Sequence, residues 1–271
     1  MEQQRWHVTR SRRSWAELQR RVMLVAAMSL SLSFPSAAQA RDLVVFGEPT
    51  LMNALQRIGA AWRERSGVRV NVFAAPSDLS FAQIDRGARC DLVFALTGST
   101  TDDAERQGII RSRPLAPSLR NSLLLVARSG SARTIAPSDR TELASFLEGK
   151  RLAIANPDRD PAGAPALRWL RALGWRGEEG KSLIVAESSA GVAQSLADNG
   201  AQAGIVYATD AAARSDLAAI AALPERDDGA IQYVAVEATD SKSDPKPFLD
   251  FLGSREAHDI LRASGVQLVG E

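Results

Sequence analysis

The chain has 271 residues, with 33 lysines and arginines, 32 aspartates and glutamates, and a formal net charge of +1 at pH 7. This near-neutral balance, with no basic run after residue 40, argues against a nucleic-acid-binding protein. The single cysteine, Cys90, cannot form an internal disulfide, so a hydrophobic core must stabilise the fold. Because Cys90 lies beside a strand-like segment, we predict that it is a small buried hydrophobic residue.

Residues 1–40 have the organisation of a cleaved secretory signal peptide. Six arginines precede or flank the apolar run VMLVAAMSLSLSF, which is shorter than the roughly 20 residues that a membrane-spanning helix needs. Ala38–Ala40 (AQA) form an A-x-A cleavage signal, so we expect a soluble exported protein that begins near Arg41 and has no membrane anchor. SRRSWA resembles a twin-arginine signal only loosely, which leaves the export route open. Removing these 40 residues leaves 231, with 27 basic and 30 acidic side chains and a net charge of −3.

Strand-like and helix-like segments alternate from residue 42 to residue 108. Apolar runs predict strands at 42–46, 68–73 and 90–96, and amphipathic segments predict helices at 50–66, 77–87 and 101–108. Gly67 and Gly87 follow the first two helices, where glycine commonly ends a helix. This βαβαβ order predicts a parallel sheet that is covered by helices.

A second α/β unit follows, and the chain then returns to the first. Strands are predicted at 121–128, 150–156, 182–188 and 203–208, with helices at 162–174, at 189–200 and from Asp210 onward. A late strand at 230–238 and a helix pair at 247–265 complete the first unit. We therefore predict an α/β protein of two lobes, each a mostly parallel sheet flanked by helices. Lobe I would comprise residues 41–122 and 234–271, lobe II residues 123–233, with two crossover segments between them.

The turns that follow the predicted strands carry small or hydroxyl residues just before a helix begins: GEPT, AAPS, PDRDPAG, ESSAG and YATD. Ligands of open α/β sheets bind at the carboxyl ends of the strands. Helix N-termini there offer free backbone N–H groups and a partial positive charge, so several together can bind an anion without lysine or arginine. Each turn alone is better explained by ordinary N-capping. The recurrence of such turns in both halves of the chain favours an anion-binding site.

These segments, taken in order, carry a resemblance that covers the whole chain after residue 40. The relevant stretches are VVFGEPTLMNAL, APSDLSFAQIDRGARCDLVF, RNSLLLVA, LAIANPDRDPAG, AGIVYATDA and FLDFLGSREAHDIL. The chain resembles the periplasmic molybdate-binding proteins of ABC importers, which have the type II fold of periplasmic binding proteins.

The resemblance implies a tetrahedral oxyanion, molybdate or tungstate, held by neutral donors alone. The matching positions are the hydroxyl and backbone groups of Thr50 and Ser77, the backbone N–H groups of Ala162 and Ser189, and the phenol of Tyr207. It implies no cofactor and no metal coordinated directly by the protein. It also implies a partner, the ABC permease of the inner membrane, and we expect a periplasmic monomer.

Three ligand turns depart from the family pattern, and this leaves another oxyanion or a small organic acid as an alternative ligand. The first turn contains Glu48 and Pro49, the second keeps only Ser77 of its serines, and the turn at 96–98 reads Leu-Thr-Gly. A carboxylate near a dianion would repel it. We therefore predict that Glu48 lies at the rim of the ligand cleft and pairs with a basic residue of the opposing lobe, with Arg159 as the candidate, to latch the closed form.

Two other function classes are alternatives. A hydrolase is the weakest, because His258 is the only histidine after residue 40 and the chain has no G-x-S-x-G, P-loop or metal-ligand motif. We therefore predict that the protein is not an enzyme. A sensor that binds the ligand without transport is the other alternative, although the sequence contains no signalling or DNA-binding segment.

Overall fold

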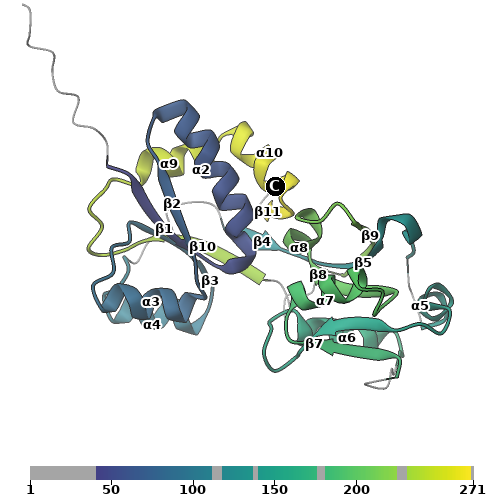
Figure 1. Ribbon diagram of the computed structural model, residues 1–271. Coiled ribbons are helices and arrows are strands. Elements are labelled where there is room, and N and C mark those ends of the chain that lie inside the picture. The colour runs from purple at the N-terminus through teal and green to yellow at the C-terminus, as the bar shows by residue number, and fades with distance from the viewer. Residues whose placement is uncertain (1–40, 112–117, 137–139, 176–180, 225–230, 270–271) are drawn as a thin grey trace, which may run out of the picture. The chain divides into compact units, whose positions relative to one another are not determined.

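The computed structural model describes residues 41–111, 118–136, 140–175, 181–224 and 231–269 (Figure 1). The predicted signal peptide, with its cleavage signal at Ala38–Ala40, lies outside these residues. Within the described ranges, no helix is long and apolar enough to cross a membrane.

The described residues form two β-sheets, and the first has six strands in the order β11-β4-β10-β3-β1-β2. Its strands are β1 (Leu43–Gly47), β2 (Val70–Ala74), β3 (Leu92–Leu96), β4 (Leu119–Asn121), β10 (Ile231–Glu237) and β11 (Val266–Leu268). β1 runs parallel to β2 and to β3, so the carboxyl ends of these three strands share one edge of the sheet. β10 runs antiparallel to β3 with Tyr233 opposite Leu96, which brings the beginning of β10 to the same edge.

The second sheet has five strands in the order β7-β6-β8-β5-β9. Its strands are β5 (Leu123–Arg128), β6 (Leu152–Ala155), β7 (Leu183–Ala186), β8 (Ala203–Tyr207) and β9 (Leu217–Ala222). β6 is parallel to β7 and β8, whereas β5 is antiparallel to β8, with Leu123 opposite Tyr207. Both sheets are therefore mixed rather than mostly parallel as predicted, because β5 and β10, which follow the crossings between the sheets, run antiparallel to their neighbours.

Side-chain alternation along the strands gives the first sheet an apolar surface on each face. Val45 and Phe94 point into the core that contains residues of α2 (Met52–Ser66), α9 (Lys246–Leu252) and α10 (Arg255–Ala263). Phe46 and Val93 point the other way, toward α3 (Ser77–Asp85) and α4 (Ser99–Arg106). Figure 1 shows α2 and α9 on one side of this sheet and α3 and α4 on the other.

The helices of the second sheet are α5 (Arg140–Leu147), α6 (Gly163–Ala172), α7 (Ser189–Ala197) and α8 (Ala208–Ala212). Two glycines allow close approach of helix and strand. A Cβ at Gly163 would lie 2.5 Å from the backbone oxygen of Ala155, at the end of β6. A Cβ at Gly204 in β8 would lie 2.5 Å from Cγ1 of Val192 in α7. The N-terminus of α6 is thus held close to the carboxyl end of β6, and the Tyr207 N–H donates to the Ser189 hydroxyl at 3.0 Å, which joins the end of β8 to the start of α7.

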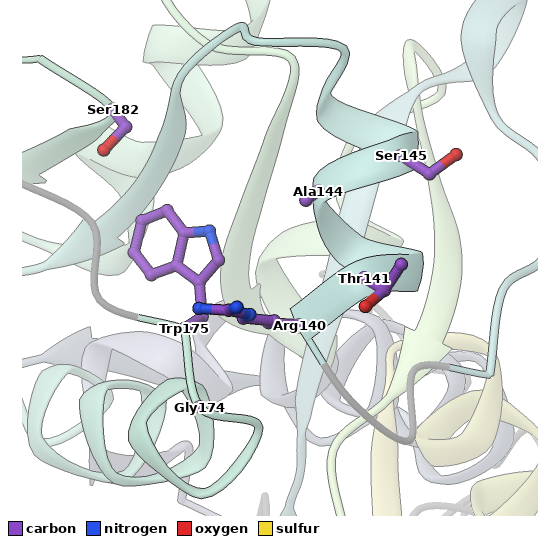
Figure 2. A pocket seen from close by; sticks show the side chains of 7 residues that line it. All are labelled: Arg140, Thr141, Ala144, Ser145, Gly174, Trp175 and Ser182. Atoms are coloured by element: carbon purple, nitrogen blue, oxygen red, sulfur yellow. The ribbon is translucent and has the colours of Figure 1, made fainter.

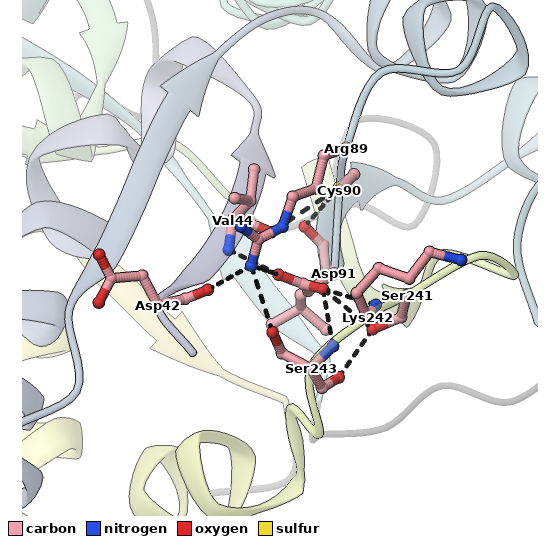
Figure 3. Close-up of polar contacts among 9 residues, drawn as sticks. Asp42, Val44, Arg89, Cys90, Asp91, Ser241, Lys242 and Ser243 are labelled. Carbon is pink, nitrogen blue, oxygen red and sulfur yellow. Dashed lines mark hydrogen bonds and ion pairs between the residues drawn. The ribbon is translucent and has the colours of Figure 1, made fainter. Parts of the chain in front are cut away.

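A fully buried carboxylate, Asp91, ties the C-terminal return segment to the first sheet (Figure 3). Its Oδ1 accepts hydrogen bonds from the backbone N–H groups of Lys242 and Ser243 at 3.0 and 3.1 Å and from the Ser241 hydroxyl at 3.2 Å. Its Oδ2 accepts from Val44 N–H at 2.9 Å and lies 3.4 Å from a guanidinium nitrogen of Arg89. A buried carboxylate with this many donors is a structural anchor.

Most predicted elements match, with Gly67 in the left-handed conformation at the end of α2 (φ 75°) and Cys90 buried as predicted. α5, β9, β11 and two short 3-10 helices, η1 (Pro49–Leu51) and η2 (Ser129–Ser131), were not predicted. The predicted strand at 121–128 is two strands separated at Ser122, and α8 begins at Ala208 rather than Asp210.

The chain passes from the first sheet to the second between Asn121 and Leu123, and it returns to the first sheet between Ala222 and Ile231. These two passages are the predicted crossovers. The exact lobe boundaries at 122/123 and 233/234 stay a prediction, and the second would divide β10 after Tyr233.

Candidate functional site

The turn after β1 carries two side chains with different surroundings, Thr50 and Glu48. Thr50 lies in η1, and its Oγ1 is 2.8 Å from the hydroxyl of Tyr233, which is almost fully buried at the beginning of β10. Burial raises the pKa of Tyr233 to about 12. Thr50 is therefore tied to the first sheet by a neutral hydrogen bond.

The Tyr233 hydroxyl belongs to a hydrogen-bond network that extends to α8. Nδ2 of Asn121, the last residue of β4, donates to the Tyr233 hydroxyl at 3.3 Å and to Oγ1 of Thr209 at 3.0 Å. Within the described part of the chain, the buried Oδ1 of Asn121 has no hydrogen-bond partner. Buried acceptors are nearly always paired, so this oxygen is a place for a donor from water or a ligand.

Glu48 is buried and reaches the first residue of α3. Its Oε1 accepts a hydrogen bond from the backbone N–H of Ser77 at 2.7 Å and a second, very short one from the Ser77 hydroxyl. The Ser77 hydroxyl in turn accepts from the backbone N–H of Leu96 at 2.9 Å. Burial raises the pKa of Glu48, the bonds from Ser77 oppose this, and the nearby charge of Asp78 adds to the rise. A carboxylate thus occupies the N-terminus of α3.

Asp160 plays the same part on the second sheet, in the turn after β6. Its Oδ1 accepts from the backbone N–H of Ala162 at 2.8 Å, and its Oδ2 accepts from the backbone N–H of Ser189 at 2.9 Å. Ala162 is the N-cap of α6 and Ser189 is the first residue of α7. One carboxylate therefore bridges two helix N-termini, where the free N–H groups and the helix dipole favour an anion.

Ser189 and Asp210 join the start of α7 to that of α8. The Ser189 hydroxyl donates to Oδ2 of Asp210 at 2.5 Å and accepts from the backbone N–H of Tyr207 at 3.0 Å. Burial raises the pKa of Asp210, the bond from Ser189 opposes the rise, and the charge of Asp160 adds to it.

Tyr207, at the end of β8, has a buried ring within electrostatic range of groups from both sheets. Burial raises the pKa of Tyr207, and Asp160, Tyr233, Asp210 and Glu48 raise it further, in that order. Among the described residues, no group hydrogen-bonds the Tyr207 hydroxyl, whereas that of Tyr233 has two partners. The phenol of Tyr207 is therefore the uncommitted donor of the site.

The structure is similar to known binding proteins. Residues 43–267 match the family model described as "Bacterial extracellular solute-binding protein". The chain is 32% identical over 243 residues to the molybdate-binding protein ModA of Escherichia coli (strain K12), covering 89% of this chain and 94% of that protein. The chain belongs to this solute-binding family.

Two solved structures show that the fold is also shared with solute-binding proteins. A substrate-binding domain from Clostridium difficile, described as part of a molybdenum ABC transporter, has a TM-score of 0.71 and 21% identity. The match covers 85% of this chain and all (100%) of that one. The periplasmic molybdate-binding protein of Azotobacter vinelandii has a TM-score of 0.61 and 18% identity, with 84% and 99% covered. The α/β fold predicted from the sequence is confirmed.

In this solute-binding protein, the five residues predicted to contact a ligand all lie at the carboxyl edges of the two sheets. Thr50 and Ser77 follow β1 and β2, and Ala162, Ser189 and Tyr207 lie at the ends of β6, β7 and β8. The charges around Tyr207 connect the two groups, because Glu48 bonds Ser77 and Asp160 bonds Ala162 and Ser189. Their role in binding remains a prediction.

The predicted pairing of Glu48 with Arg159 at the cleft rim is wrong in this structure. Glu48 is buried, with only 8% of its surface exposed, and bonds Ser77 of its own sheet. Arg159 instead forms an exposed ion pair with Glu187, 2.5 Å between Nη1 and Oε2. The N-terminus of α3 offers Glu48 both an N–H and a hydroxyl, which draws the carboxylate inward.

Sequence reasoning missed the acceptors of the site, Asp160 and Asp210, and the supporting residues Asn121, Thr209 and Tyr233. Asp160 and Asp210 lie inside turns that the sequence had marked as helix starts, PDRDPAG and YATD, so their positions carried a signal. Asn121 and Tyr233 carried none, because they reach the edge only through antiparallel pairing.

Two cavities lie beside the second sheet at the edge where the parallel strands β6 and β7 begin, opposite the edge that carries the predicted ligand residues. One, of about 630 Å³, lies between α5 and the Trp175 indole (Figure 2). The other, of about 610 Å³, includes Lys150, Arg151 and Lys181, which precede β6 and β7. Neither includes a predicted ligand residue. No cluster of metal-ligating side chains occurs in the part of the chain that the structure describes.

Proposed function

We propose that this solute-binding protein captures a tetrahedral oxyanion, molybdate or tungstate, in the periplasm and delivers it to an ABC permease of the inner membrane. The observation that carries the proposal is that backbone N–H groups at the helix N-termini donate hydrogen bonds to carboxylates. The backbone N–H groups of Ser77, Ala162 and Ser189 all donate to carboxylate oxygens of the chain itself. These donors are thus arranged for anionic oxygen, the chemistry that an oxyanion presents.

The donor set is suited to a dehydrated oxyanion. Three backbone N–H groups, the Thr50 hydroxyl and the buried phenol of Tyr207 make up five neutral donors that need no charged side chain. Hydrogen bonds to a charged group contribute about 1.5–3 kcal/mol each. A Kd of about 1 μM corresponds to roughly 8 kcal/mol, and the bonds to the oxyanion must supply it in excess of those that the N–H donors make to the chain's own carboxylates.

The similarity to the Escherichia coli molybdate-binding protein supports the ligand class, and the names of the matched structures support a transport role. Sulfate and phosphate have the same shape as molybdate and smaller size, so selection among them depends on the dimensions of the closed site. Delivery to a permease predicts that a strain without this gene accumulates less of the cognate oxyanion at low external concentration.

A ligand screen on the chain from Arg41 onward tests the proposal. Molybdate, tungstate, sulfate, phosphate and small carboxylates are added in turn, first in thermal unfolding and then in titration calorimetry. A ligand at about 100 times its Kd adds roughly 2.7 kcal/mol of stability, which raises Tm by about 5–10 °C for a chain of this size. We expect molybdate or tungstate to give that shift with one site per chain. Absence of any shift with every oxyanion would contradict the proposal, and a shift with carboxylates alone would favour the organic-acid alternative.

A further inference from the structure

The donors expected to hold the oxyanion are already occupied by the chain's own carboxylates. Glu48 takes both the N–H and the hydroxyl of Ser77, and Asp160 takes the N–H groups of Ala162 and Ser189. Four hydrogen-bond donors from three of the five predicted ligand residues are therefore engaged. The Tyr207 phenol, by contrast, has no bond among the described residues.

Among the described residues, no positively charged side chain bonds either carboxylate. Within this part of the chain, Glu48 accepts from Ser77 alone, and Asp160 accepts from the backbone N–H groups of Ala162 and Ser189. The nearest cation to Asp160 in sequence, Arg159, is paired with the exposed Glu187. A carboxylate held by neutral donors at a helix N-terminus is in the position that a bound oxyanion would take, and the two anions would compete for the same N–H groups.

We infer that Glu48 and Asp160 occupy the anion site as internal surrogates for the ligand, and that an oxyanion binds by displacing their carboxylates and driving the site to take up protons. The inference rests on the proposed function and identifies the residues that set its affinity and pH dependence. The displaced carboxylates remain near a dianion, and proton uptake from solvent removes the repulsion between the carboxylates and the dianion.

Mostly acidic and phenolic groups face the two carboxylates. Around Glu48 they are Asp78 at the start of α3, Tyr233 of β10 and Tyr207 of β8. Around Asp160 they are Asp210 of α8 and Tyr207, with the Arg159–Glu187 pair on the exposed side. Burial is the chief cause that raises the pKa values of Glu48 and Asp210. A bound dianion would raise the pKa values of these two carboxyls further, so affinity falls as pH rises.

Calorimetric titration of the unmodified chain tests the inference without any substitution. Molybdate is titrated at one pH in buffers with different ionisation enthalpies, and the dependence of the observed heat on the buffer gives the number of protons taken up. We expect net uptake at about pH 7, and a Kd that weakens by up to about tenfold per pH unit for each proton taken up. Molybdate binding without proton uptake, and with a Kd independent of pH, would overturn the inference.

Three single variants identify the residues. Glu48→Gln keeps an oxygen for Ser77 and removes the charge, and Asp160→Asn keeps an acceptor for only one of its two N–H donors. Glu187→Gln is the matched control, because it removes a nearby carboxylate that touches none of the donors. We expect the first two to bind molybdate at least about fivefold more tightly at about pH 7.5. We expect Glu48→Gln also to take up fewer protons, and the control to change Kd less than about twofold.

The outcomes separate this inference from the function on which it rests. If neither the unmodified chain nor any variant binds an oxyanion, the proposed function is wrong, and the inference falls with it. If the unmodified chain binds molybdate but the first two variants match the control, the inference alone is overturned. Weaker binding by Glu48→Gln and Asp160→Asn, in variants whose Tm stays close to that of the unmodified chain, would also overturn it, because the carboxyls would then be partners of the ligand.

Discussion

Asp91 and Glu48 are both buried carboxylates of the first sheet, and they differ in the number and the charge of their donors. Asp91 accepts from three backbone N–H groups, a serine hydroxyl and the Arg89 guanidinium. Within the described ranges, Glu48 accepts only from the N–H and hydroxyl of Ser77. A fully satisfied carboxylate fixes a fold, whereas one held by a single residue can be replaced by another anion. Asp91 is therefore a structural anchor, whereas Glu48 is a carboxylate that we propose an oxyanion displaces.

The largest effect is expected from removal of Asp91. Asp91→Ala leaves the buried N–H groups of Val44, Lys242 and Ser243 without their acceptor, and we expect a loss of about 3–5 kcal/mol in the free energy of unfolding. For a chain of this size, Tm would fall by roughly 6–20 °C. Urea unfolding measures the change. Asp250→Ala, which removes an exposed partner of Lys246, is the control and should cost under about 1 kcal/mol. Equal stabilities of the two variants would refute the anchoring role.

The next largest effect distinguishes Tyr207, which we expect to contribute to oxyanion affinity, from Tyr233, which we expect to contribute to stability. Tyr207→Phe removes a hydroxyl with no bond in the described structure, so we expect unchanged stability and oxyanion binding weakened by about 1–3 kcal/mol. Tyr233→Phe breaks the bonds to Thr50 and Asn121, so we expect a loss of stability of about 1–2 kcal/mol instead. Calorimetry and thermal unfolding on both variants measure the two effects. Unaltered oxyanion affinity in Tyr207→Phe would remove this residue from the site.

The positions of the helix starts could be predicted from the sequence because they depend on local chemistry. Ser188 is the N-cap of α7 and its hydroxyl accepts from the Gly191 N–H, as is common for serine, and Ser77 begins α3 directly after Pro76. β9 was missed because its run of alanines, LAAIAA, has little strand character, and β11 because it is three residues long. The occupants of the helix N-termini could not be predicted in full. Glu48 reaches Ser77 across 29 positions, and the orientation of its side chain depends on how β1 and β2 pair.

A smaller effect concerns the pH dependence of stability. The pKa of Glu48 is raised in the folded protein, so the folded state holds this proton to higher pH than the unfolded state does. Its contribution to stability is complete below the ordinary glutamate pKa and is lost as pH rises through the raised value. We expect Glu48→Gln to lose less stability than the unmodified chain between about pH 4.5 and 7. Parallel curves of unfolding free energy against pH would contradict this expectation.

The smallest effect is expected at the exposed ion pair that replaces the predicted latch. Arg159→Ala breaks only its contact with Glu187, and both side chains are mostly exposed. We expect the unfolding free energy to change by less than about 1 kcal/mol and oxyanion affinity by less than about threefold. A loss of affinity of tenfold or more in calorimetry would restore Arg159 to a part in closing the site.

A crystal structure of the chain with tungstate tests the central claim most directly, because the dense metal atom locates the ligand without ambiguity. The account predicts that tungstate oxygens accept hydrogen bonds from the backbone N–H groups of Ser77, Ala162 and Ser189 and from the Tyr207 hydroxyl. The carboxylates of Glu48 and Asp160 would no longer contact those N–H groups. Tungstate bound elsewhere, with both carboxylates still bonded to their helix N-termini, would contradict the account.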